Sequence, residues 1–237
     1  MLHRFAYSVC GAKFCNRSNY AEVIKVVVGE ERRTFLVHKD LICQRAAFFS
    51  ATCSDNWKEG DEKVVHLPEQ SANAFSVFLE ATYESSTDIV GLVRATFPPS
   101  STTGPSGELE TYDDGTMMQA LIDSWLLGDY MDNKHFKNMV IDALYKCSAM
   151  GLQEHITTSF LKKTPPGSAL ERFFVGIIAV CYVGELQALW ETLGDSFKFA
   201  LTDRLLRMRN FGKEKMDICD YHDHEDGVVR CENGGKK

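Results

Sequence analysis

The last 25 residues contain four side chains of the kinds that bind transition metals. Cys219, His222, His224 and Cys231 form the pattern C-x2-H-x-H-x6-C, with four sulfur or imidazole donors within 13 residues. Zinc prefers four such donors in a tetrahedral arrangement, and two thiolates would neutralise its charge. The pattern therefore predicts a zinc site made by these four residues. The alternative is a polar tail without metal, because the H-x-H spacing differs from that of a standard zinc finger.

The segment Trp57-Lys58-Glu59 is a second candidate site, for a protein partner. A large apolar side chain beside a carboxylate is typical of a binding hot spot, since the first fills a pocket and the second fixes the orientation. The alternative is that Trp57 packs inside its own domain and Glu59 is only solvated.

Catalytic patterns are poorly represented in the sequence. His38-Lys39-Asp40 places a base beside a carboxylate, but no nucleophile or oxyanion site follows at a matching spacing. Paired carboxylates, a phosphate-binding loop and triad spacing are also not found. We therefore expect a protein that is not an enzyme.

The composition is that of a globular protein, with 237 residues, 44% of them hydrophobic and 25% charged. Fifteen Phe, eight Tyr and three Trp exclude disorder of the whole chain, because they can build a sizeable core. The net charge of −7 disfavours a polyanion as the main partner. Arg204, Arg207, Arg209, Lys213 and Lys215 form a basic group, but no known DNA-binding motif accompanies them, so direct nucleic-acid binding is not expected.

No membrane partner is expected, because the longest apolar run, Phe173 to Val183, has 11 residues and a membrane span needs about 18–20. The first eight residues lack the long apolar run of a signal peptide. The eight cysteines are then expected to be thiols or metal ligands in a reducing compartment. These features predict an intracellular protein, in the cytoplasm, the nucleus or both.

Hydrophobic patterns predict a few strands followed by many helices. Strands are expected at 23–28, 34–37 and 64–67, the first two as a hairpin, with two short helices before the third strand. Helices follow wherever apolar residues recur at helical spacing, starting with one for which Ser71 is the N-cap. The later ranges are 118–126 and 136–147, which form a helical hairpin, then 169–183, 186–193 and 197–208. A Ser-, Pro- and Gly-rich stretch at 95–115 is expected to be a loop.

This order of features resembles that of the BTB/POZ domain, of the type found in filamentous fungi. The resemblance is carried by Val23–Gly29, Phe35–Leu41, Phe48-Phe49, Trp57–Glu59, Val65–Glu69, Leu126–Tyr130 and Phe136–Leu144. It implies an α+β fold, in which a small mixed sheet with helices is followed by an all-helical region. The implied division is an N-terminal segment at 1–19, a BTB/POZ domain at 20–148 that contains the 95–115 insertion, a helical region at 149–212, and a polar tail at 213–237 with the Cys/His cluster.

The resemblance also implies a function. BTB/POZ domains are non-enzymatic modules for protein–protein interaction, so a homodimer or a larger assembly is expected. In BTB adaptors a hydrophobic residue followed two positions later by Glu contacts a cullin scaffold, a role that would fall to Trp57 and Glu59. The resemblance also places His38-Lys39-Asp40 at a junction between a strand and a helix, which is a structural role and not a catalytic one. The alternative function is a transcriptional or chromatin-associated regulator that acts through BTB-mediated assembly.

Overall fold

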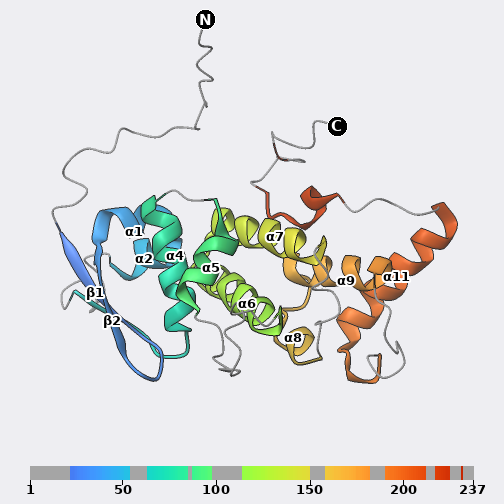
Figure 1. Cartoon of the computed structure of the whole chain (residues 1–237), viewed down its shortest axis with the longest axis horizontal. Coiled ribbons are helices and arrows are strands. Elements are labelled where there is room, and N and C mark those ends of the chain that lie inside the picture. The colour runs from blue at the N-terminus through green and yellow to red at the C-terminus, as the bar shows by residue number, and fades with distance from the viewer. Residues whose placement is uncertain are drawn as a thin grey trace, which may run out of the picture. The chain divides into compact units, whose positions relative to one another are not determined.

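The computed structural model describes residues 22–53, 63–84, 87–97, 114–149, 158–181, 190–211, 217–224 and 231 (Figure 1). Its element order is a small sheet with two short helices, followed by helices only. This order confirms the predicted α+β class with a helical C-terminal region. The chain divides into two compact units, Met1–Pro68 and Glu69–Lys237.

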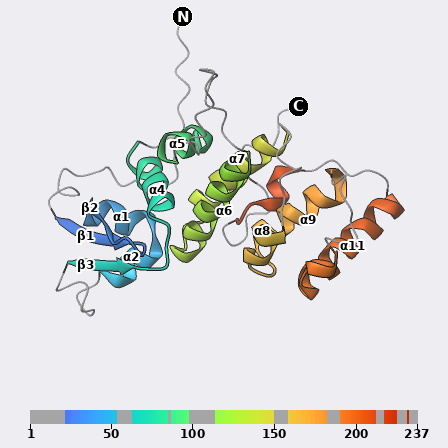
Figure 2. The same cartoon turned by 60° about the horizontal axis from the view of Figure 1, so that its bottom comes forward.

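The first unit is built on a three-stranded sheet with the order β2-β1-β3 (Figure 2). Strand β1 (Val23–Val28) pairs antiparallel with β2 (Arg33–His38) and parallel with β3 (Val64–Leu67). Gly29 begins the turn of the hairpin with a φ of 76°, a conformation that costs glycine little. The mixed sheet and its hairpin therefore lie where the sequence predicted them.

The alternating side chains give the sheet one fully buried face and an opposite face that is largely exposed, although Val27 of β1 on that second face is only 7% exposed. The buried face consists of Ile24, Val26, Val28, Val37, Val65 and Leu67. On the opposite face lies Leu36 of β2, which is 73% exposed and stands in register with Lys25 of β1. This face therefore presents an apolar side chain to solvent.

Two short helices, α1 (Lys39–Arg45) and α2 (Ala47–Thr52), follow the hairpin. His38 is both the last residue of β2 and the N-cap residue of α1, and Asp40 lies in the first turn, where a negative charge favours a helix. The predicted junction between strand and helix is thereby confirmed. Phe49 of α2 is fully buried and meets the ring of Phe48 edge to face at 5.2 Å.

The second unit begins with α4 (Ala72–Glu84) and α5 (Ile89–Thr96). The hydroxyl of Ser71 accepts a hydrogen bond from the backbone nitrogen of Ala74 at 3.2 Å, as the predicted N-cap requires. Helix α5 was not expected, although Asp88 caps it through the backbone nitrogen of Gly91 at 3.1 Å. The predicted loop at 95–115 is consequently shorter at both ends, since 95–96 belong to α5 and 114–115 to the next helix; residues 98–113 lie outside the described part.

The predicted helical hairpin is formed by α6 (Asp114–Tyr130) and α7 (Lys134–Ala149), which pack side by side. The amide oxygen of Asn133 caps α7 by accepting a hydrogen bond from the backbone nitrogen of Phe136 at 2.8 Å. The ring of Phe136 also packs edge to face against Phe78 of α4. The largest fully buried side chains of α6 are Met118, Leu121, Ile122 and Trp125.

The rest of the second unit contains α8 (Thr158–Lys163), α9 (Ala169–Cys181) and α11 (Asp195–Phe211). Ser168 caps the N-terminus of α9, because its hydroxyl accepts a hydrogen bond from the backbone nitrogen of Glu171 at 3.1 Å. The Glu171 carboxylate accepts from Gly167 N at 2.6 Å and from the hydroxyl of Ser196 at 3.3 Å, which ties α9 to α11. Helix α8 was not expected. Of the helices described, none has the length and apolar character that a bilayer span requires.

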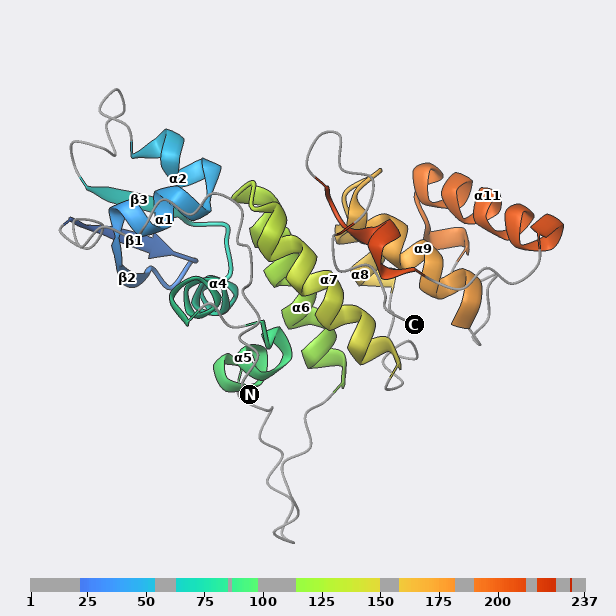
Figure 3. The same ribbon diagram turned by 90° about the horizontal axis from the view of Figure 1, so that it is seen from above.

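A short 3-10 helix, η3 (Ile218–Tyr221), packs against both α7 and α9 and is the red segment next to them in Figure 3. We call residues 217–224 the strap. The sequence predicted a polar tail here, whereas Cys219 and Tyr221 are only 6% and 4% exposed. The strap is therefore a packed part of the helical unit.

Candidate metal centre

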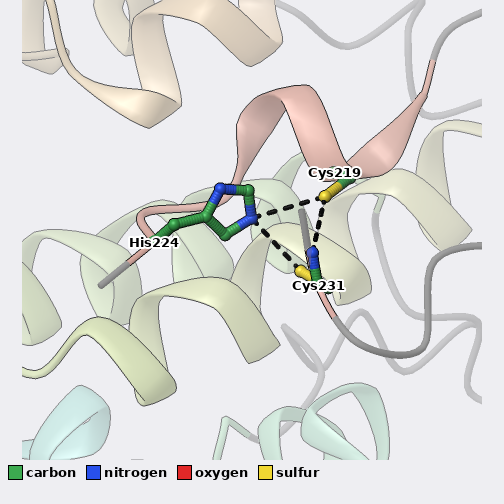
Figure 4. A group of neighbouring side chains, drawn as sticks. All are labelled: Cys219, His224 and Cys231. Carbon is green, nitrogen blue, oxygen red and sulfur yellow. Dashed lines mark hydrogen bonds between the residues drawn. The ribbon is translucent and has the colours of Figure 1, made fainter. Parts of the chain in front are cut away.

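Three of the four predicted metal ligands come together at the end of the strap. The sulfurs of Cys219 and Cys231 and a ring nitrogen of His224 all lie within 4.8 Å of one another (Figure 4). Nε2 of His224 lies 3.3 Å from each of the two sulfurs. The backbone nitrogen of Cys231 donates to Sγ of Cys219 at 3.1 Å. Two thiols and an imidazole thus share one small volume.

The fourth predicted ligand, His222, reaches this group through one contact. Its Nδ1 lies 3.1 Å from the sulfur of Cys231, although His222 is not among the three residues in mutual proximity. Its other ring nitrogen, Nε2, lies 3.1 Å from a carboxylate oxygen of Asp142 on α7. The His222 ring is therefore held between a carboxylate and the cysteine cluster.

Helix α7 positions the histidines by binding the strap backbone between them. The side-chain amide of Asn138 accepts from the backbone nitrogen of Asp223 at 2.8 Å and donates to its carbonyl oxygen at 2.9 Å. One turn earlier, Lys134 donates to the carbonyl oxygen of His224 at 3.5 Å. Because Asp223 lies between His222 and His224, these bonds fix the direction in which both rings leave the strap.

The side chain of Asp223 is held by cations from two helices. Nζ of Lys137 on α7 lies 2.7 Å from one carboxylate oxygen, and Arg172 of α9 lies 3.6 Å from the other. Lys137 also pairs with Asp129 at 2.9 Å and lies over the Trp125 ring. Burial opposes the charge of Lys137, but the two carboxylates outweigh it and raise the pKa of this lysine above its usual value.

The apolar anchor of the strap is Tyr221. Its ring meets Phe173 of α9 edge to face, with the ring centres 5.7 Å apart. Gly176, one turn further along α9, leaves room for this ring, because a Cβ at that position would clash with the phenol oxygen. The strap thus contacts α7 through polar bonds, and it contacts α9 through ring packing and the ion pair with Arg172.

The electrostatics of the cluster suit a cation. Burial, and then the neighbouring Cys219, raise the pKa of Cys231 to about 11, and the carboxylate of Asp142 acts in the same direction. Each of these effects disfavours the deprotonated form of the thiol. A divalent cation bound to the sulfurs would favour that form, because it supplies positive charge next to them. The donor set of thiols and imidazoles fits a borderline metal such as zinc.

Several residues that build this site could not be found in the sequence. Asp142 and Asn138 lie 80 or more positions before the residues that they contact, and nothing in the local pattern of α7 marks them. Conversely, Trp57 and Glu59 lie outside the described residues. Of the basic group, Arg207 on α11 pairs with Asp203 at 2.8 Å, and Lys213 and Lys215 also lie outside the described part.

Comparison with known proteins identifies the first part of the chain. The sequence model of the BTB/POZ domain matches residues 14–96. The match stops at the end of α5, so the inclusion of α6 and α7 in that domain stays a prediction. No curated protein and no solved structure matches the chain. The hairpin, the parallel third strand and the helices between them agree with this match, and residues 14–96 therefore belong to the BTB/POZ domain family.

Proposed function

We propose that this chain is a non-enzymatic adaptor that assembles proteins through its BTB/POZ domain, and that one partner is the scaffold of a cullin-type ubiquitin ligase. The observation that carries the proposal is the family match over residues 14–96. BTB/POZ domains mediate protein–protein interactions and often dimerise. Assembly through this part of the chain is the role that its family membership favours.

The surface of the sheet supports a role in protein interaction. In the part of the sheet that the structure describes, β2 is an edge strand and carries the exposed side chain of Leu36. Val23, on the same face, is 44% exposed. An edge strand offers backbone groups to another chain, and neighbouring apolar side chains gain free energy when a partner removes them from water. The hairpin face is thus suited to contact a second protein.

The proposed cullin contact rests on Trp57 and Glu59, which lie within the family match and between α2 and β3 in sequence. The indole would fill an apolar pocket of the scaffold, and the carboxylate would orient the contact by pairing with a donor beside it. This arrangement concentrates binding energy on two side chains, so their removal should weaken binding strongly.

The test is direct binding of the purified full chain to a purified cullin N-terminal domain by calorimetry. Truncation of a hot-spot pair costs ~2 kcal/mol or more, so Trp57→Ala with Glu59→Ala should weaken binding about 30-fold or more. The matched control is Phe199→Ala with Glu191→Ala, which removes an exposed aromatic ring and a carboxylate from the helical unit and should bind like the wild type.

Three results would contradict the cullin contact. The first is a wild-type chain that fails to bind the cullin, and the second is a double variant that binds it as tightly as the wild type does. The third result is loss of the helical circular dichroism signal in the Trp57 and Glu59 variant, because unfolding would place the indole in the core of its own domain.

The alternative function, a transcriptional or chromatin-associated regulator, has less support. A direct contact with nucleic acid would use the arginines of α11, but Nε of Arg207 binds the Asp203 carboxylate one turn away. A pair of this kind leaves less positive charge for phosphates. A regulator that acts only through BTB-mediated assembly would dimerise and yet fail to bind the cullin.

A further inference from the structure

We propose that the chain binds one zinc ion through Cys219, His222, His224 and Cys231, with Asp142 of α7 as the carboxylate that orients His222, and that this ion joins the strap to Cys231. This inference goes beyond the adaptor function, because it concerns the second unit and does not depend on any protein partner.

The distances between the donors fit a tetrahedral ion. With zinc–sulfur bonds of about 2.3 Å and zinc–nitrogen bonds of about 2.0 Å, a sulfur and a nitrogen ligand lie about 3.5 Å apart. Three of the four sulfur–nitrogen pairs of the proposed ligands lie 3.1, 3.3 and 3.3 Å apart, close to that separation. His222 must move for four-fold coordination, so that its Nδ1 approaches the other two donors as closely as it approaches Cys231.

The contact with Asp142 determines which nitrogen of His222 can bind the ion. A carboxylate accepts a hydrogen bond, so the proton of the neutral imidazole lies on Nε2, 3.1 Å from the Asp142 oxygen. The lone pair then lies on Nδ1, the atom that faces the sulfur of Cys231. Histidine ligands of zinc commonly have such a carboxylate behind them, and the carboxylate fixes the orientation of the ring.

The strap holds its ligands in place by contacts that need no metal. Asn138 binds both backbone groups of Asp223, between the two histidines, and Tyr221 packs on Phe173 between Cys219 and His222. Because the ligands are ordered in advance, less entropy is lost when the ion binds. The ion would strengthen the link from the strap to Cys231, which without metal consists of weak contacts such as the 3.1 Å hydrogen bond from the backbone nitrogen of Cys231 to Sγ of Cys219.

Zinc is the metal that this donor set favours. Thiolate and imidazole ligands in a tetrahedral arrangement select zinc over calcium or magnesium, which prefer oxygen. Four protein ligands also leave no open position for a substrate, so the ion is structural. Each thiol loses its proton to solvent as it binds the metal.

The experiment measures zinc in the purified full chain by elemental analysis, after preparation without chelator. We expect one zinc ion per chain, and almost none in Cys219→Ser with Cys231→Ser or in His222→Ala. X-ray absorption should show two sulfurs at about 2.3 Å and two nitrogens at about 2.0 Å. The control variants Cys43→Ser and His66→Ala change a half-buried thiol and an exposed imidazole of the first unit, and both should keep the full zinc content.

The role of Asp142 is tested separately with Asp142→Asn, which should weaken zinc binding by about 10- to 100-fold in a chelator competition. Titration of the metal-free wild type with Co²⁺ needs no variant, and it should give the visible absorption of a tetrahedral ion with thiolate ligands. Absence of that spectrum, or equal zinc in the wild type and the double cysteine variant, would overturn the site. Unchanged affinity in both His222→Ala and Asp142→Asn would overturn the four-ligand assignment.

Discussion

At the scale of single residues, the two units rely on charged groups in different environments. In the first unit Glu22 is partly exposed, and its pKa is lowered by a hydrogen bond to Lys63 and by the charge of Lys39. Ion pairs of this exposed kind contribute little to stability. In the second unit Asp223 bridges Lys137 and Arg172, and Lys137 is nearly buried. Ion pairs in the helical unit therefore contribute to its packing, because they hold the strap against α7 and α9.

Asp123 of α6 gives a prediction about pH. Burial raises the pKa of this carboxyl, although Lys163 and a 2.6 Å hydrogen bond from Gln119 act against the shift. The folded protein therefore favours the neutral form of Asp123 more than the unfolded chain does. This preference stabilises the fold below the ordinary aspartate pKa, and the stabilisation is lost as the pH rises through the raised pKa. Asp123→Asn keeps an oxygen for Gln119 and removes the charge.

We expect Asp123→Asn to unfold at a higher temperature than the wild type at pH 7, and the difference should shrink towards pH 4 and below. Thermal unfolding followed by circular dichroism at several pH values checks this. A variant that is less stable at neutral pH would show that the pair with Lys163, at 3.9 Å, outweighs the burial of the charge.

At the scale of elements, the packing of the strap on α9 depends on a single glycine. Gly176→Ala adds a methyl group where it clashes with the phenol oxygen of Tyr221, so the strap must move away from α9. Overpacking of this kind costs about 1–3 kcal/mol, and the gain in helix propensity of about 1 kcal/mol offsets only part of it. Hydrogen exchange at residues 217–224 should therefore become faster.

The matched control for this substitution is Gly194→Ala, which adds the same methyl group at the start of α11 where no atom lies within 4 Å. Exchange of the strap should be unchanged in this variant. Equal exchange rates for the strap in Gly176→Ala and the wild type would mean that Tyr221 does not hold the strap on α9.

Helices and strands in which apolar residues recur regularly over several turns or residue pairs could be predicted from the sequence. The short helices α5 and η3 could not. The β-branched run of β1 and the apolar stripe of α7 each identify one element, because the period is sustained over several residues. Helix α5 has only eight residues and contains Gly91, so its period is too short to stand out. For η3, the acidic residues of the tail suggested solvent, and the burial of Tyr221 depends on α9, a distant part of the chain.

In the candidate metal site, the ligands that are close together in the sequence could be predicted, whereas the residues that contact them from another helix could not. The four ligands stand out because Cys and His are rare and closely spaced, and the structure brings three of them into mutual proximity. The residues that orient them, Asp142 and Asn138, come from another helix. A single sequence carries no sign of such a pair, because the contacts form only after the helices have packed.

At the scale of the whole molecule, the proposed assembly and the proposed zinc binding belong to separate parts of the chain. The BTB/POZ match ends at residue 96, whereas the strap packs against α7 and α9, which begin at Lys134 and Ala169. Loss of the metal should therefore loosen the strap and leave self-association unchanged.

Native mass spectrometry of the full chain at tens of micromolar tests whether dimerisation and metal binding are independent, because one spectrum gives both the oligomeric state and the bound metal. We predict a dimer that carries two zinc ions, and a dimer of the Cys219→Ser and Cys231→Ser variant that carries none. A strictly monomeric wild type would contradict assembly through the BTB/POZ domain. A wild-type dimer without zinc, or a variant that loses both zinc and dimerisation, would contradict the separate roles of the two parts.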